Sequence, residues 1–165
     1  MAAGEAFGLR LFGMRALMSL RLEKSYGTWF REYRPIYTVP EAGLGRYVRL
    51  DHEFIGRAAY EAELAGGGPA RRLVSFVVDP DPDAPADVIG DEPIWHDDTV
   101  VGWVTSGGYG HHVGKSIALG YVPAELATSD GPGGDGFEIE IIGRRRPARL
   151  QPEPLFDPQG LRMRA

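Results

Sequence analysis

One stretch near the N-terminus carries the side chains best suited to bind a ligand. It contains Arg21, Glu23, Tyr26 and Trp29, and Glu41 follows further along the chain. A carboxylate beside aromatic rings suits a flat nitrogen heterocycle, because it accepts two parallel hydrogen bonds from adjacent N–H groups while the rings cover the faces. The alternative is a surface arginine–glutamate pair beside core aromatics, and the residue types alone favour that alternative.

Other catalytic chemistries find little support in the residues. The four histidines, His52, His96, His111 and His112, lack the helical HxxxH and HExxH spacings of zinc enzymes, and the chain has no cysteine, so we expect no metal site. Ser106 stands in TSGG rather than in a GxSxG nucleophile elbow. We therefore expect Ser106 to lie in a loop that uses the positive φ of glycine rather than to act as a nucleophile.

Nucleotide binding is only weakly indicated by the glycine-rich stretches. Residues 66–68, 107–110 and 131–136 match neither the P-loop GxxxxGK[ST] nor a GxGxxG that follows a strand and opens a helix. The second pattern is also the one expected of a flavoprotein. The sequence therefore predicts no FAD site in this chain.

Composition limits the class of protein. The 165 residues are 43% hydrophobic and include 23 Gly and 13 Pro, which predicts a turn-rich folded domain. The net charge of -5 makes a nucleic-acid partner unfavourable. No apolar run approaches the ~18 residues of a membrane span, and the N-terminus lacks a signal-peptide pattern. We therefore expect no membrane association and a cytoplasmic protein, or part of a larger soluble one.

The N-terminal part reads as helical and irregular. Apolar spacing predicts a helix over 13–26 with an uncertain last turn, and another over 53–64 that is stopped by GGGP at 66–69. Between them, 27–44 is rich in aromatics without a clean period, and 45–50 predicts a short strand. This part is too small to have its own hydrophobic core. We therefore expect it to pack against the barrel or against an upstream region that is not in this chain.

From residue 71 onward the pattern changes to short runs of β-branched and aromatic residues separated by Gly, Pro and Asp. Six strands are expected, at 71–78, 92–95, 99–105, 115–122, 137–142 and 146–151. A small closed barrel hides the edges of such a sheet. The sequence therefore predicts an α+β fold, with a helical and irregular segment at 1–70 and an antiparallel β-barrel of about six strands at 71–165.

A set of motifs then shows a resemblance that spans nearly the whole chain. LRLEK, EAGL, FIGR, VTSG and SIALGYV follow one another from residue 20 to residue 122, and PEPLFDPQGLRMR closes the chain. In this order and spacing they resemble the folate-binding aminomethyltransferase family, which includes the glycine cleavage T-protein. The likeness is strongest to the C-terminal part of dimethylglycine and sarcosine dehydrogenases.

The resemblance implies a function and a set of roles. Complete members have a longer tetrahydrofolate-binding part, so this chain would be the end of that region followed by its C-terminal barrel. The family's pterin-contacting glutamate falls on Glu23, a nearby aromatic falls on Trp29, and we expect Tyr26 in the same folate site. The family's catalytic aspartate lies upstream, so no catalytic residue is assigned here. The implied partner is the upstream half or a partner subunit of the same enzyme.

Two alternatives stay open at this point. The chain could instead be a non-catalytic barrel that docks on a partner or self-associates, and an exposed apolar surface around Leu9, Phe12, Met14 and Met18 would support this. The basic residues at 144–146 and 149 could meet the acidic tail of folate, although a solvated sheet edge is the favoured interpretation.

Overall fold

The computed structural model describes residues 2–128, 136–162 and 164. The helices are α1 (Ala2–Glu5), α2 (Met14–Glu23) and α3 (Arg57–Ala65), with short 3-10 turns at Gly45–Tyr47 and Ala124–Leu126. The strands are β1 (Arg71–Val78), β2 (Pro93–His96), β3 (Thr99–Gly110), β4 (Lys115–Pro123), β5 (Phe137–Ile141) and β6 (Arg144–Gln151). The expected α+β class, with helices first and a barrel after them, is confirmed.

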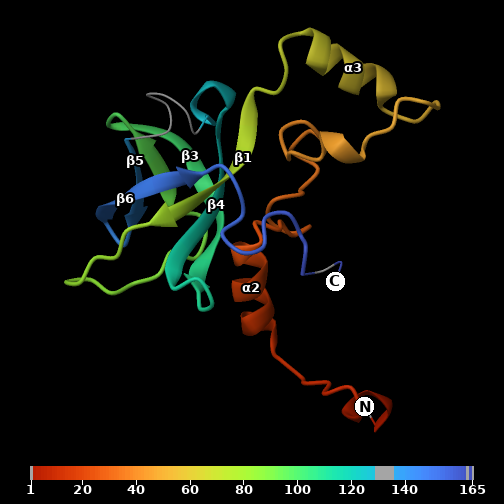
Figure 1. Cartoon of the computed structure of the whole chain (residues 1–165). Helices are drawn as coiled ribbons and strands as arrows, with labels where there is room; N and C mark the ends of the chain where they lie inside the picture. Colours follow the sequence, from red (N-terminus) through yellow and green to blue (C-terminus); the bar gives the residue numbers. More distant parts are fainter. Residues whose placement is uncertain (1, 129–135, 163, 165) are drawn as a thin grey trace.

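The six strands form a closed antiparallel barrel in the order β1-β4-β3-β2-β5-β6 (Figure 1). Pairing of β1 with β6, from Ser75 opposite Gln151 to Val78 opposite Ala148, closes the sheet on itself. Closure leaves the barrel without a free sheet edge, which is how small β folds avoid pairing with other chains.

Alternation along the strands fills the barrel. In β5 the side chains of Phe137, Ile139 and Ile141 are buried while the glutamates between them are half-buried. The Phe137 ring meets the fully buried Phe76 ring edge-on, with 5.0 Å between the ring centroids. Burial of such side chains contributes about 1.5–3 kcal/mol each, so this core stabilises the barrel substantially.

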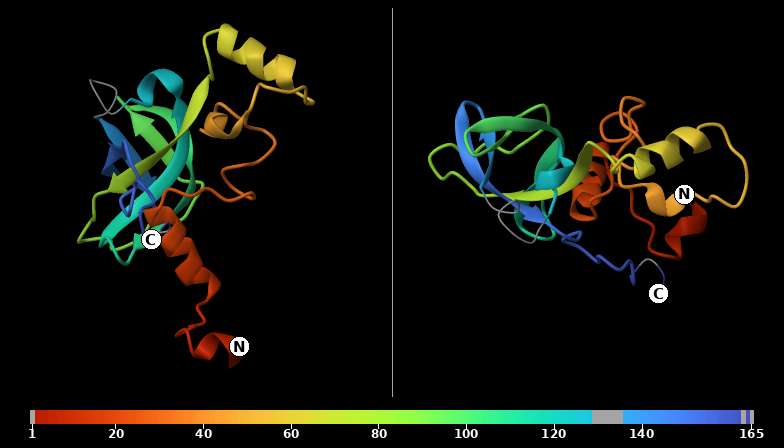
Figure 2. Two further views of the ribbon diagram at one scale, coloured as in Figure 1. Left: turned by 45° about the vertical axis from the view of Figure 1, so that its right-hand side comes forward. Right: turned by 90° about the horizontal axis from the view of Figure 1, so that it is seen from above.

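Helix α2 docks on the barrel through its C-terminal turn. Leu22 is buried and packs with Ile117 and Leu119 of β4. The predicted helix over 13–26 is shorter in the structure: it ends at Glu23, and Ser25, two residues later, adopts a positive φ of 52° that a helix cannot continue through. Figures 1 and 2 show α2 running from the barrel toward the N-terminus.

The remaining N-terminal segments differ in part from expectation. The strand expected at 45–50 is wrong: its first residues form a 3-10 turn in which the Tyr47 N–H donates to the Leu44 carbonyl. Helix α3 starts at Arg57 rather than at 53, because Gly56 at φ 96° interrupts the backbone before it. No residue of α3 is buried, and Figures 1 and 2 show this helix away from the barrel.

The loop expected around Ser106 is also wrong. Strand β3 continues through Ser106 to Gly110. The glycines serve close packing instead of a turn: a Cβ added at Gly107 would lie 2.7 Å from Val88, whose neighbour Ile89 accepts the Gly107 N–H at 2.8 Å. No helix in the described ranges is long and apolar enough to cross a membrane.

Candidate binding site

Glu23 ends helix α2 and its carboxylate is buried, with only 2% of the residue exposed. Its Oε1 atom accepts the backbone N–H of His112 at 2.7 Å and, more weakly, that of Val113 at 3.4 Å. These donors belong to the turn between β3 and β4. These two hydrogen bonds attach the end of α2 to the barrel.

The segment after β6 crosses the same end of α2. The Phe156 N–H donates to the Glu23 carbonyl at 2.9 Å. The Phe156 and His112 rings meet edge-on, with 4.7 Å between their centroids. Lys24 Nζ donates to the Asp157 carbonyl at 2.5 Å and to its carboxylate at 3.2 Å. Glu23 is thus enclosed by α2, the β3–β4 turn and the C-terminal segment.

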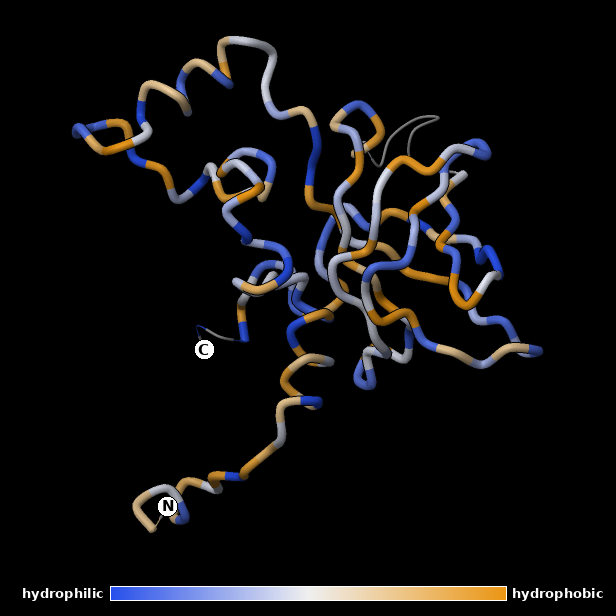
Figure 3. The backbone as a smooth tube through the Cα atoms, turned by 180° about the vertical axis from the view of Figure 1, so that it is seen from behind, coloured by the Kyte–Doolittle hydropathy of each residue, from blue (hydrophilic) through white to orange (hydrophobic). Residues whose placement is uncertain are grey.

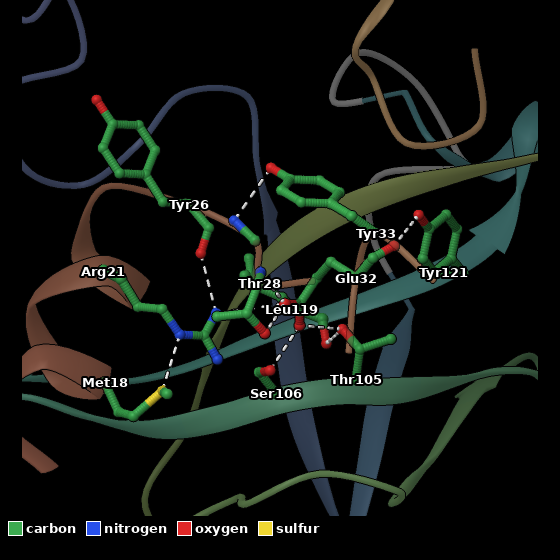
Figure 4. A network of polar contacts seen from close by, with 11 residues as sticks. Met18, Arg21, Tyr26, Thr28, Glu32, Tyr33, Thr105, Ser106, Leu119 and Tyr121 are labelled. Atoms are coloured by element: carbon green, nitrogen blue, oxygen red, sulfur yellow. Dashed lines mark hydrogen bonds and ion pairs between the residues drawn. The ribbon is translucent and has the colours of Figure 1, made fainter. Parts of the chain in front are cut away.

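A second buried carboxylate, Glu32, has no exposed surface and joins the N-terminal loop to β3 (Figure 4). Its Oε1 accepts the hydroxyls of Thr105 at 2.7 Å and Ser106 at 2.5 Å. Its Oε2 accepts the Thr28 N–H at 2.7 Å, and its carbonyl accepts the hydroxyl of Tyr121 at 2.8 Å. The sequence interpretation missed this residue.

Arg21 pairs with Glu32 and not with Glu23. Its Nη1 lies 3.4 Å from Glu32 Oε2 and donates to the Tyr26 carbonyl at 2.9 Å, as Figure 4 shows. Burial lowers the pKa of Arg21 from its ordinary value, while the Glu32 charge opposes that shift. The alternative of an Arg–Glu pair is met in part: Arg21 pairs with a glutamate, but the pair is shielded rather than on the surface. Among the described residues no cation pairs with Glu23.

The two expected aromatic residues lie apart from the Glu23 carboxylate's contacts. Tyr26 is 45% exposed and lines a groove of about 920 Å³, whereas Trp29 is 68% exposed and does not line it. Glu23 is not among the lining residues either. In this chain the carboxylate faces the β3–β4 turn, one ring faces the groove and the other faces solvent.

The groove lies between the N-terminal loop, β1 and the segment after β6. Its walls include three tyrosines and three charged side chains that could meet a ligand: Tyr26, Tyr33, Tyr47, Arg46, Arg72 and Glu153. The Arg46 guanidinium stacks on the Tyr47 ring at 4.8 Å and donates to its hydroxyl. Aromatic rings and cations along one groove suit a flat ligand with an anionic part.

The basic run of β6 is paired within the barrel. Three of its arginines bridge to acidic residues of the loops, as Arg144–Asp81, Arg145–Asp98 and Arg149–Asp79. Arg146 is buried and donates to the carbonyls of Ala84 and Ala86. These ion pairs within the barrel do not favour an anion site. The expected sheet edge is wrong, because β6 pairs with β1 on one side and with β5 on the other. Within the described ranges, no group of three or more His, Cys, Asp or Glu could hold a metal ion.

Two family models match the chain. The model described as the glycine cleavage T-protein C-terminal barrel domain matches residues 71–157, and the GCVT N-terminal domain matches residues 1–52. The first match covers the barrel, and the second covers α1, α2 and the loop that carries Glu32.

Named relatives agree with these models. The chain is 38% identical to dimethylglycine dehydrogenase of Mus musculus over 94% of its length, but spans only 17% of that protein. It is 37% identical to an aminomethyltransferase of Acidobacterium capsulatum, covering 93% of this chain and 39% of the relative. It is also 35% identical to human sarcosine dehydrogenase and spans 18% of it.

A solved structure supports the fold. The glycine cleavage system aminomethyltransferase T from Bartonella henselae superposes with a TM-score of 0.77 at 23% identity, over 90% of this chain and 40% of that one. Together with the barrel model that matches residues 71–157, these findings show that the chain belongs to the glycine cleavage T-protein family of aminomethyltransferases.

Proposed function

We propose that the chain is the C-terminal portion of a tetrahydrofolate-dependent aminomethyltransferase or demethylase of the dimethylglycine or sarcosine dehydrogenase type, with the catalytic carboxylate on protein outside it. The observation that carries the proposal is the buried carboxylate of Glu23. It stands in the LRLEK motif at the point where the N-terminal part meets the barrel.

The chemistry of the residues fits a pterin. Glu23 uses Oε1 for the turn, and within the described part of the chain its Oε2 makes no hydrogen bond, so one oxygen remains to accept a ring N–H. Tyr26 and Trp29 offer rings that are 45% and 68% exposed. Bound tetrahydrofolate would supply the nitrogens that receive the one-carbon unit. In this proposal Glu23 orients the ring, the aromatic residues cover it, and neither moves a proton.

Calorimetric titration of tetrahydrofolate into wild type and Glu23→Gln tests the folate role. The amide oxygen still accepts the His112 N–H, while the charge that would bind the pterin edge is lost. A charge-assisted hydrogen bond contributes about 1.5–3 kcal/mol, so we expect affinity to fall roughly tenfold to a hundredfold. Glu61→Gln, on the exposed face of α3, is the matched control and should bind as wild type does. Equal affinity of wild type and Glu23→Gln would remove Glu23 from the site.

A second candidate function is favoured by one observation. Leu9, Phe12, Met14 and Met18 are 57%, 64%, 66% and 36% exposed. Such a surface suits a barrel module that docks on a partner subunit without catalysis of its own. Retained partner binding together with an absence of tetrahydrofolate binding, in the assembled complex, would select this function. The cytoplasmic location expected from the N-terminus stays a prediction.

A further inference from the structure

The segment between α1 and α2 is an extended apolar arm. Residues 9–13 belong to no helix or strand, and Gly13 has φ -87° and ψ 170°. Figure 1 shows this arm leading away from the barrel, and Figure 3 shows that it is strongly hydrophobic. Leu9, Leu11 and Phe12 are 57%, 75% and 64% exposed. A chain that folds in water rarely leaves three large apolar side chains within four residues uncovered.

The backbone of the arm is unpaired as well. The Leu9 N–H donates to Gly4 and the Gly13 carbonyl accepts from Leu17, but no described residue bonds the N–H groups of Arg10, Leu11 and Phe12. In an extended chain Leu9 and Leu11 point to one side while Arg10 and Phe12 point to the other. An apolar extended segment with open N–H and C=O groups has the properties of an edge strand without a sheet.

Helix α2 continues the same exposed surface. Met14, Leu17 and Met18 are 66%, 44% and 36% exposed and are spaced as i, i+3 and i+4, which places them on one stripe. Leu22, four residues after Met18, continues this stripe and packs against β4. The stripe is therefore buried at its C-terminal end by the barrel and exposed from Met14 to Met18.

We propose that the arm adds as an edge strand to a sheet in the polypeptide that supplies the rest of the family fold, with the stripe of α2 packed beside it. This inference rests on the proposed function. The length of the relatives indicates this partner. The chain spans 39% of the Acidobacterium capsulatum relative and 40% of the Bartonella henselae structure, so most of the family fold lies outside it. Main-chain hydrogen bonds then supply affinity, and the alternating side chains set the register.

Hydrogen exchange on the full chain tests the pairing directly. The probe is the part of the Acidobacterium capsulatum aminomethyltransferase that lies outside the matched region, expressed as a separate polypeptide. We expect the two to form a complex in which the amides of Arg10, Leu11 and Phe12 exchange at least about a hundredfold more slowly than in the chain alone. A complex in which these amides stay unprotected would overturn strand addition, and so would failure to form a complex.

Two pairs of variants separate the backbone from the side chains. Leu11→Pro removes one N–H and should weaken the complex at least about tenfold, whereas Leu11→Val keeps the strand and should bind as wild type does. Leu11→Asp should also weaken binding about tenfold or more, while Ile142→Asp, at an 85% exposed position on the β5–β6 turn, should not. Equal binding by all four variants would overturn the proposal.

Two further readouts keep this inference distinct from the folate proposal. Self-association of the chain alone, with protection of the same three amides, would assign the arm to a second copy and overturn the proposed occupant. Tetrahydrofolate titration of the assembled complex reports on Glu23 separately. Strand pairing without any effect of Glu23→Gln on the affinity for tetrahydrofolate would exclude the folate role of Glu23 and would still support the docking surface.

Discussion

The carboxylate of Glu32 accepts the Ser106 hydroxyl at 2.5 Å, although 74 residues separate the two in the chain. This bond, with that from Thr105, anchors the loop after α2 on the barrel wall. The loop carries Trp29, so the position of an expected ligand-facing ring depends on a contact made by a strand far along the sequence. Glu32 is therefore a positioning residue for the candidate site.

Glu32→Gln should destabilise the protein by about 3 kcal/mol. The substitution leaves the shielded Arg21 charge without its partner, and removing one member of a buried ion pair typically costs that much. It also replaces one acceptor oxygen by an amide donor in a site where Thr28, Thr105 and Ser106 all donate. Urea unfolding measures the change, and Glu61→Gln on α3 should change the free energy of unfolding by under about 0.5 kcal/mol.

A double-mutant cycle with Arg21→Met assigns the energy to the pair. If the Arg21–Glu32 contact carries the effect, the two substitutions together should cost less than the sum of their separate costs, with a coupling of about 1–3 kcal/mol. Additive costs would show that the hydroxyls of Thr105 and Ser106, rather than the guanidinium, account for the loss.

Gly120→Ala should destabilise the barrel by about 2 kcal/mol or more. A Cβ at this position of β4 would lie 2.6 Å from Ile94 Cδ1 and 2.7 Å from the Trp103 carbonyl oxygen. The carbonyl oxygen belongs to the backbone of β3, so relieving this contact would require a shift of the strand. Gly13→Ala, where nothing lies within 4 Å, should cost no more than about 1 kcal/mol as the loss of a helix N-cap glycine. Thermal unfolding compares the two, and equal effects would contradict the argument from close packing.

Trp29→Ala separates folding from ligand binding. The side chain is 68% exposed, so the free energy of unfolding should change by less than about 0.5 kcal/mol. If Trp29 covers one face of the pterin in the assembled protein, the affinity for tetrahydrofolate should fall at least about tenfold, since stacking on an aromatic ring contributes about 1–3 kcal/mol. Unchanged affinity in the complex would exclude the ring from the site.

Acidification should release the segment after β6 from α2. Desolvation alone would raise the pKa of Asp157, but the Lys24 ammonium and the N–H groups of Arg162 and Leu161 outweigh it and hold the pKa below its usual value of 3.8. Because the folded protein favours the carboxylate, its contribution to stability is full above that value and is lost as the pH falls below it. Melting temperatures at about pH 5 and about pH 3 should therefore differ less in Asp157→Asn than in wild type.

Much of the barrel could be predicted from local pattern. Strand β1 has the predicted bounds, 71–78, and β5 shows the predicted alternation, because a half-buried strand needs only its own side chains and flanking turn residues to be recognised. The end of β3 was missed for a non-local reason. Gly107 lets Val88 approach the strand and Gly110 lets Ile117 approach it, and sequence spacing does not contain these contacts.

The candidate site was only partly predictable. Its motif located Glu23, but the donors that hold it belong to a turn 89 residues away. Glu32 was missed because an acid between Arg31 and Tyr33 looks like an ordinary surface residue. Only the hydroxyls of β3, brought close by the fold, make its burial favourable.

Closure of the barrel has a consequence for how the chain is made. β1 leaves the ribosome early, yet one of its two neighbours is β6, which is translated after every other strand. Helix α2 emerges earlier still and finds its docking surface only when β3 and β4 have paired. During translation the apolar faces of α2 and β1 are therefore exposed together, and the nascent N-terminal part is most prone to aggregate in the interval before the last strand arrives.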